Sequence, residues 1–222
     1  MAILETSNFS AIPSQKERLA ERHTTEPTET TCCGMAIRVF GGVYKTSADT
    51  ELMAETVQIA PTQTFLEIGC GVGVISIVLG KKALSGVGVD INNLAIENSL
   101  FNAKRHNVTN VSFFKSDIFN DVKGKFDVIV CNPPYSDHPA ADNIEKMFWD
   151  PDNEMKRRFF KEVNTFLNEN GRIYFGWANF ADLDLQLPFR LAQEAGFEIE
   201  DIYSKLSPKK TCTFYVLAFK KV

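Results

Sequence analysis

The chain has 222 residues, which suits a single domain with a short appendage. Apolar residues make up 44% of it, so a sizeable core is possible, and the net charge of −4 disfavours extended nucleic-acid binding. Because no apolar run reaches the length of a membrane span and the N-terminus lacks a secretory pattern, we expect a cytoplasmic protein without a membrane partner.

Five cysteines occur, an odd number without any Cys-x-x-Cys pair, which disfavours a disulfide framework and a metal site. Cys70 and Cys131 stand in apolar surroundings that are typical of small core residues in a reduced cytosolic protein. We therefore expect no metal in this protein.

The first 34 residues are polar and rich in threonine, glutamate and serine. Residues 1–34 are predicted to be a flexible or lid-like segment, with a short helix over 14–22 and a mobile threonine-rich stretch over 24–31. Residues 35–222 are predicted to form the main domain. Its first part, 35–43, alternates weakly and suggests a small strand or hairpin bending at Gly41-Gly42.

Strand and helix patterns alternate from Ser47 onward, which favours an α/β, doubly wound, mostly parallel seven-stranded sheet closed by an antiparallel C-terminal hairpin. In the long helix before the fifth strand, Asn170-Gly171 is the expected stop, and Pro188 is expected to kink the next helix. The predicted strands are 64–68, 86–89, 111–114, 126–131, 172–177, 197–203 and 211–219, and the helices 47–59, 72–79, 92–106, 152–167 and 183–195.

The most specific stretch is Asn132-Pro133-Pro134-Tyr135, which ends a buried apolar strand. Two prolines cannot continue a sheet ladder, so the chain leaves the sheet at the carboxyl end of a strand, where open α/β sheets bind ligands. The Asn132 carbonyl and a main-chain carbonyl, that of Pro133, offer two acceptors for one NH2 group. Tyr135 adds a flat face for a planar substrate, although an ordinary strand-ending turn would use the same residue types.

A second motif, Glu67-Ile-Gly-Cys-Gly-Val-Gly73, follows the first predicted strand, and Asp90 ends the next one. Glycines let the backbone approach a ligand, and a carboxylate at the position of Asp90 is placed to accept from ribose hydroxyls. The dinucleotide fingerprint would need glycine at position 74, which is valine. Glu67 suits a cation better than a pyrophosphate, and S-adenosylmethionine, a nucleoside with a sulfonium, satisfies both observations.

These motifs, together with Ser116-Asp117-Ile118, occur in an order that resembles the class I S-adenosylmethionine-dependent methyltransferases over residues 40–220. More narrowly, the chain resembles the amino-methylating Asn-Pro-Pro-Tyr branch, which includes release-factor glutamine methyltransferases and adenine-N6 and guanine-N2 methyltransferases. Residues 43–50 also resemble the entry motif of the release-factor branch, although Lys45-Thr46 lacks its proline. The resemblance implies a Rossmann-like methyltransferase domain over 35–222.

The resemblance also implies roles for individual residues. The loop of Gly69, Cys70, Gly71 and Gly73, preceded by Glu67, would bed the methionine part of S-adenosylmethionine. The acceptor nitrogen would lie at Asn132, Pro133 and Tyr135. Asp90 would hold the ribose, Ile91, Asp117 and Ile118 would surround the adenine, and Thr50 or Asp49 would close over the cofactor.

Several acceptors remain open: a protein glutamine, an RNA or DNA base, and a small metabolite, which a lid over residues 1–34 would favour. A non-catalytic cofactor-binding subunit is the alternative outside the enzyme class. Among other residues, His138 is expected in a solvated loop and Lys156-Arg157-Arg158 on a solvated helix face. Trp149 is expected either to wall the site or to anchor its loop.

Overall fold

The computed structural model describes residues 4–22 and 26–222. Its centre is a seven-stranded sheet with the order β5-β4-β3-β6-β7-β9-β8, and the neighbouring pairs from β5 to β7 are parallel. Strand β9 is antiparallel to both β7 and β8, which confirms the predicted closing hairpin. The strands are β3 (Thr64–Ile68), β4 (Ser85–Asp90), β5 (Val111–Lys115), β6 (Phe126–Cys131), β7 (Leu167–Ala178), β8 (Phe197–Leu206) and β9 (Thr213–Lys221).

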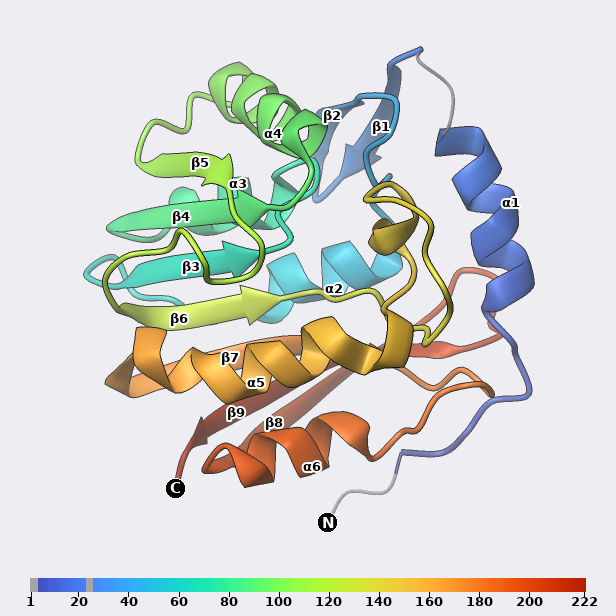
Figure 1. Cartoon of the computed structure of the whole chain (residues 1–222). Helices are drawn as coiled ribbons and strands as arrows, with labels where there is room; N and C mark the ends of the chain where they lie inside the picture. Colours follow the sequence, from blue (N-terminus) through green and yellow to red (C-terminus); the bar gives the residue numbers. More distant parts are fainter. Residues whose placement is uncertain (1–3, 23–25) are drawn as a thin grey trace.

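Helices cover both faces of the sheet, as the doubly wound pattern predicts (Figure 1). Both faces of the sheet need cover because successive side chains of strand β6 belong to two different hydrophobic cores. Ile129 and Cys131 pack with α5 and α6, whereas Val128 and Val130 pack with α2 and α3. The helices are α1 (Ile12–Arg22), α2 (Ala48–Thr56), α3 (Val74–Gly80), α4 (Asn93–Arg105), α5 (Glu154–Phe166) and α6 (Leu187–Glu194), with 3₁₀ turns η1 (Glu145–Met147) and η2 (Pro151–Asn153).

The hairpin near the N-terminus differs from the prediction. Strand β2 (Met35–Val39) pairs with β1 (Thr28–Cys32), so the bend lies at Cys33-Gly34 and not at Gly41-Gly42. Both bend residues have positive φ, 50° and 69°, as a two-residue hairpin turn requires. The threonine-rich stretch thus contains a strand, because threonine favours extended backbone despite its polarity; its residues 24 and 25 lie outside the described part of the chain.

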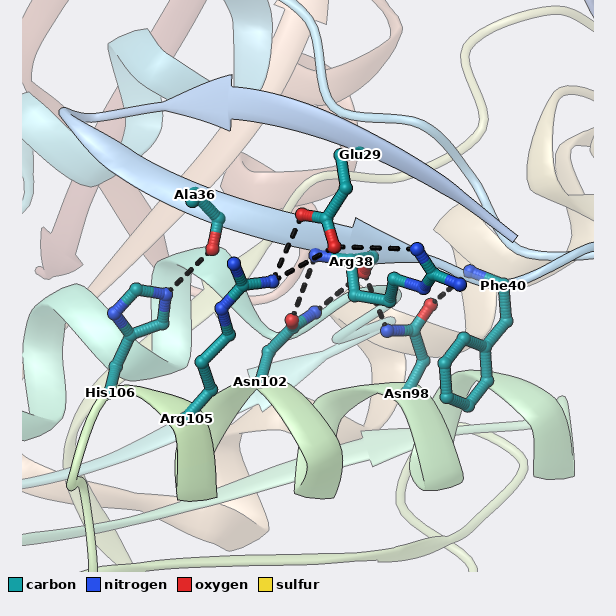
Figure 2. A network of polar contacts seen from close by, with 8 residues as sticks. All are labelled: Glu29, Ala36, Arg38, Phe40, Asn98, Asn102, Arg105 and His106. Atoms are coloured by element: carbon teal, nitrogen blue, oxygen red, sulfur yellow. Dashed lines mark hydrogen bonds and ion pairs between the residues drawn. The ribbon is translucent and has the colours of Figure 1, made fainter.

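The hairpin is fastened to α4 by a polar network (Figure 2). The Asn102 Oδ1 accepts from the Arg38 N–H at 3.0 Å, and the Asn98 and Asn102 side chains both donate to the Arg38 carbonyl at 2.8 Å. Arg105 adds an ion pair with Glu29 at 2.9 Å. Because Asn98 and Asn102 are fully buried, the network fixes the position of α4, which in turn supports the glycine loop described below.

Two further boundaries depart from the predictions. Helix α5 ends at Phe166, before Asn170-Gly171, because Leu167 is already extended and pairs with Phe126. Pro188 lies in the first turn of α6 and therefore does not kink it, since the first turn has no intrahelical partner for the missing N–H. Gly196, with φ of 83°, ends α6 as expected.

Candidate active site

A cavity of about 590 Å³ lies at the carboxyl edge of the sheet, where β3, β4 and β6 end. The sequence motifs meet there, as the rule for open α/β sheets predicts. Gly73 is the exception among the predicted site residues: it does not border the cavity, and a Cβ at this position would lie 3.1 Å from Ser99. The others border it: Thr50, Glu67, Gly69, Cys70, Gly71, Asp90, Ile91, Asp117, Ile118, Asn132, Pro133 and Tyr135.

The glycine loop forms one wall of this cavity with its backbone. Gly69 and Gly71 have φ of 76° and 53°, and a Cβ added at either would meet no atom within 4 Å, so the space beside them is open. Helix α4 holds the loop from behind, since the Ser99 hydroxyl donates to the Gly71 carbonyl at 2.9 Å and Asn102 donates to that of Val72 at 2.9 Å. The loop is therefore preorganised for close approach of a ligand.

Asp90 lies directly beside the loop. Its Oδ2 accepts from the Gly71 N–H at 3.0 Å and its Oδ1 from the Asn92 N–H at 2.9 Å. Burial raises the pKa of the Asp90 carboxyl, while these backbone donors oppose the shift. A carboxylate oxygen has two lone pairs, so Asp90 retains capacity to accept from ribose hydroxyls, and Ile91 follows it along the same wall.

Asp117 and Ile118 lie at the next strand end, after β5. The Asp117 carboxylate forms an ion pair at 2.9 Å with Arg158 of α5, a residue expected on a solvated helix face. Ile118 has φ of 54°, an uncommon conformation for a β-branched residue, and its carbonyl accepts from the Ser116 hydroxyl at 3.0 Å. The two residues predicted to contact the adenine therefore lie in a turn with a strained backbone, and the Asp117 carboxylate already has Arg158 as a partner.

Glu67 is only 2% exposed, and its carboxyl group faces the first turn of α3. Its Oε2 accepts from the Ser76 N–H at 2.8 Å and also from the Ser76 hydroxyl. Burial is the main cause that raises the pKa of Glu67 to about 8, against the lowering effect of Ser76. A proximity of Glu67 to a bound sulfonium stays a prediction.

Asn132 leaves the sheet one residue after β6, and its amide is held at both ends. Its Nδ2 donates to the Asp49 Oδ2 at 2.9 Å, while its Oδ1 accepts from the Tyr135 hydroxyl at 2.7 Å. Asp49 is 5% exposed and lies at the start of α2. The two contacts fix which end of the amide is oxygen, and the oxygen keeps a second lone pair.

Tyr135 is more than a flat surface. Its ring packs edge-on against Trp177 and Phe180, with centroids 6.0 Å and 5.8 Å away. Burial, followed by the nearby Asp49 carboxylate, raises the pKa of Tyr135 well above its ordinary value, so the hydroxyl stays a donor to Asn132. Stacking of a substrate on this ring stays a prediction.

Lys156 contradicts the prediction of a solvated helix face. It is 1% exposed, forms an ion pair with Asp150 at 2.9 Å, and donates to the carbonyls of Pro134 at 2.9 Å and Tyr135 at 3.3 Å. Burial lowers the pKa of Lys156, while Asp150 opposes the shift. The lysine thereby fastens the Asn-Pro-Pro-Tyr turn to α5, and the Pro133 carbonyl is not among its partners.

Trp149 borders the cavity and also anchors its loop, so a role as a wall of the substrate site stays a prediction. Its Nε1 donates to the Gln15 Oε1 at 3.1 Å, and the His138 ring lies 4.4 Å from it. The wall above Asn132 also contains side chains from the N-terminal segment, which spacing and motifs alone did not reveal: Phe9, Ala11, Ser14, Gln15 and Arg18.

These features fit S-adenosylmethionine. Open space beside Gly69 and Gly71 would accommodate the donor against the backbone, and the Asp90 carboxylate beside it would be available to a ribose. Among the described residues, no group of three or more histidine, cysteine, aspartate or glutamate side chains is arranged to hold a metal ion, and no helix is long and apolar enough to cross a membrane. The fold and the site define a methyltransferase.

The family model described as "Methyltransferase small domain" matches residues 38–193. The chain therefore belongs to the methyltransferase small domain family, and it is an S-adenosylmethionine-dependent methyltransferase with a Rossmann-like fold. A ribosomal protein L11 methylase from Lactobacillus delbrueckii subsp. bulgaricus has the same fold, with a TM-score of 0.58 and 22% identity, over 78% of this chain and 77% of that one.

Several curated relatives carry glutamine in their names, and two of them illustrate the range. A putative protein N5-glutamine methyltransferase from Methanocaldococcus jannaschii is 39% identical over 145 residues, which cover 62% of this chain and 73% of that protein. A release factor glutamine methyltransferase from Fusobacterium nucleatum is 31% identical over 151 residues, covering 61% of this chain. The match spans only 43% of the bacterial protein's length.

Proposed function

We propose that the chain methylates a planar amide or amine nitrogen that Asn132 and the Pro133 carbonyl hold by its two hydrogens. The observation that carries this proposal is the orientation of the Asn132 amide. Its Nδ2 is tied to Asp49 and its Oδ1 to the Tyr135 hydroxyl, and Asn132 lines the same cavity as the glycine loop. The side-chain amide of glutamine is the nitrogen that the names of the relatives favour.

The chemistry follows from these acceptors. S-adenosylmethionine supplies a methyl group that is already activated on its sulfonium. The nitrogen lone pair forms the new N–C bond, the C–S pair remains on sulfur, and a proton leaves the nitrogen to solvent. Positive charge grows on the nitrogen during transfer, so two oxygen acceptors bind the transition state more strongly than the neutral substrate.

The buried groups around Asn132 support this role by holding it still. Tyr135 and Asp49 fix the amide, while Lys156 fixes the following turn through the Pro134 carbonyl. Preorganised acceptors need no rearrangement as charge develops, which is the main advantage of a folded site over water. The predicted positions of Asp90, Asp117 and Thr50 around the cofactor belong to the same proposal.

A methyl-transfer assay tests it. The purified chain is incubated with methyl-labelled S-adenosylmethionine and size-separated cell extract, and the labelled product is analysed by mass spectrometry. We expect the label on an amide or amine nitrogen. Label on oxygen or carbon would contradict the proposal. The absence of transfer into any fraction would also contradict it and would favour a non-catalytic cofactor-binding subunit. Label on nucleobases would point to the RNA or DNA alternative.

A further inference from the structure

The N-terminal segment formed by residues 4–22, here termed the cover, lies across the edge at which β3, β4 and β6 end (Figure 1). Its first part is held by main-chain contacts to the segment after β7. The Ser7 N–H donates to the Asn179 carbonyl at 2.9 Å, and the Ala181 N–H donates to the Phe9 carbonyl at 2.8 Å. This part of the cover is therefore joined to the main domain almost as a further strand would be.

Helix α1, the second part of the cover, is docked by buried side chains. Gln15 is 6% exposed and accepts from the Trp149 Nε1, while Leu19, also 6% exposed, packs with Phe148 and Trp149. On the opposite side of the helix, Lys16 and Glu17 are exposed. The helix therefore presents its apolar and amide side chains to the loop above the cavity, and not to solvent.

Arg18 adds a third attachment at the mouth of the cavity. Its Nη2 donates to the Lys45 carbonyl at 3.1 Å, and its guanidinium lies 4.9 Å from the Tyr44 ring centre and 5.2 Å from that of Phe148. Such cation–π contacts attract the guanidinium to both rings. The cover is thus held at the main chain, at Trp149 and at Tyr44.

The space beneath the cover suits a small ligand. The cavity of about 590 Å³ is within the size range of small-molecule sites, and it must also hold the cofactor. Besides Tyr135, the lining of the cavity includes six aromatic side chains: Phe9, Tyr44, Phe148, Trp149, Phe180 and Phe214. An acceptor that reaches Asn132 with the cover docked is enclosed on these surfaces.

We propose that the methyl acceptor is a small molecule with an apolar body and an amide or amine nitrogen, bound whole beneath the cover. This inference rests on the proposed function and names the kind of molecule that carries the nitrogen. A glutamine on a loop of a folded protein would need the cover to leave its position, because side chains of α1 and Phe148 form part of the cavity wall. A docked cover therefore assists a small acceptor and obstructs a protein acceptor.

The first arm of the test locates the label. Cell extract is divided into a fraction below about 1 kDa, the size expected of molecules that fit a small-ligand site, and a protein fraction, and each is incubated with the full chain and methyl-labelled S-adenosylmethionine. We expect an N-methylated product in the low-mass fraction. Label on protein nitrogen would overturn this inference and leave the proposed function standing, whereas label on no nitrogen in either fraction would overturn both.

The second arm loosens the cover. Gln15→Ala and Trp149→Phe each remove the same hydrogen bond, so two variants with different packing test one contact. With a low-mass acceptor, kcat/KM should fall about tenfold, the equivalent of ~1.4 kcal/mol and the size of one buried hydrogen bond. Lys16→Ala, on the exposed face of α1, is the matched control and should be unchanged.

Whether the loosened variants lose or gain activity distinguishes a small acceptor from a protein acceptor. A protein acceptor predicts that the loosened variants are more active than the wild type, because the obstruction is weakened. Equal activity in all variants would also overturn the inference, since the cover would then contribute nothing to acceptor binding. Thermal melts of each variant, and its affinity for S-adenosylmethionine, show separately whether the fold and the cofactor half of the cavity are intact.

Discussion

The two halves of the cavity are built in different ways. The cofactor half comes from one continuous stretch, in which Gly69, Gly71, Asp90 and Asp117 follow successive strands of the sheet. The acceptor half is assembled from distant segments: the cover, the loop that ends at Trp149, and the turn before β9 that contains Cys212. Local motifs therefore form the site for the methyl donor, which many enzymes share. Long-range packing forms the site for the methyl acceptor, which is particular to this chain.

Charge differs between the halves as well. Glu67, Asp90 and Asp117 border the cofactor half, where a sulfonium cation is expected. In the acceptor half the buried carboxylates of Asp49 and Asp150 are engaged with Asn132 and Lys156. Both sets also hold the protein's own groups: Asp90 accepts from the Gly71 N–H and Asp117 pairs with Arg158, as Asp49 does with Asn132 and Asp150 with Lys156.

Lys156→Met should have the largest effect, and it acts on the acceptor half. Removing one partner of a buried ion pair leaves Asp150 uncompensated and should lower the free energy of unfolding by about 3–5 kcal/mol. Urea unfolding measures the change, with the exposed Lys161→Met of the same helix as control. Equal midpoints for the two variants would show that the buried pair contributes no stability; affinity for S-adenosylmethionine of the folded variant should be retained.

Asn132→Ala should distinguish the role of the acceptor half of the cavity from that of the cofactor half most clearly. Loss of an acceptor that binds the transition state should reduce kcat about 100-fold to 1000-fold, the range found for single preorganised groups of an active site. Binding of S-adenosylmethionine, followed by calorimetry, should survive. Asn164→Ala, an exposed position on α5, controls for the loss of an amide, and unchanged turnover in Asn132→Ala would remove this residue from the mechanism.

Asp90→Ala tests the cofactor half of the cavity, where Asn132→Ala tests the acceptor half. It removes the predicted ribose acceptor and the partner of the Gly71 N–H, so affinity for S-adenosylmethionine should fall by about 1.5–3 kcal/mol, the value of hydrogen bonds to a charged group. Calorimetry measures it against Asp121→Ala, an exposed aspartate. An unaltered dissociation constant would count against this cofactor site, while KM for the acceptor should change little in either variant.

Glu67 should give the smallest effect, visible as a pH dependence of stability. Its folded pKa of about 8 exceeds its ordinary value of 4.5, so the protonated form is favoured by folding. The stability is present at low pH and is lost as pH rises through about 8, by up to about 1.4 kcal/mol per pH unit. The free energy of unfolding of the wild type, measured by urea unfolding, should therefore be lower near pH 7.5 than near pH 6.5 by about that amount.

Glu67→Gln is the control for this pH effect, because glutamine retains an acceptor for Ser76 but does not ionise. The variant should show a smaller loss of stability between the same two pH values. If wild type and variant followed the same curve, another group would cause the dependence. A bound sulfonium should reduce the difference in the wild type, since it favours the carboxylate.

Part of this architecture was predictable because it is encoded locally. The strand 126–131 was predicted with its observed bounds, since an apolar run that meets two prolines has few other structures available. The glycine loop and Asp90 were predicted for a similar reason, because parallel strands bring their carboxyl ends to one edge. The predicted contact of Gly73 with the cofactor stays a prediction; spacing does not reveal that a Cβ at this position would lie 3.1 Å from Ser99.

The sequence by itself determined the doubly wound sheet, the cofactor motifs and the Asn-Pro-Pro-Tyr turn, because each depends on neighbours within a few residues. Only the tertiary structure decided that Lys156 is buried, that Asp49 orients the Asn132 amide, and that residues 4–22 stand over the acceptor half. Asp49 and Asn132 are 83 residues apart in sequence, and Gln15 and Trp149 are 134 apart. No periodicity or local motif reports such pairs, because their contact exists only once the chain has folded.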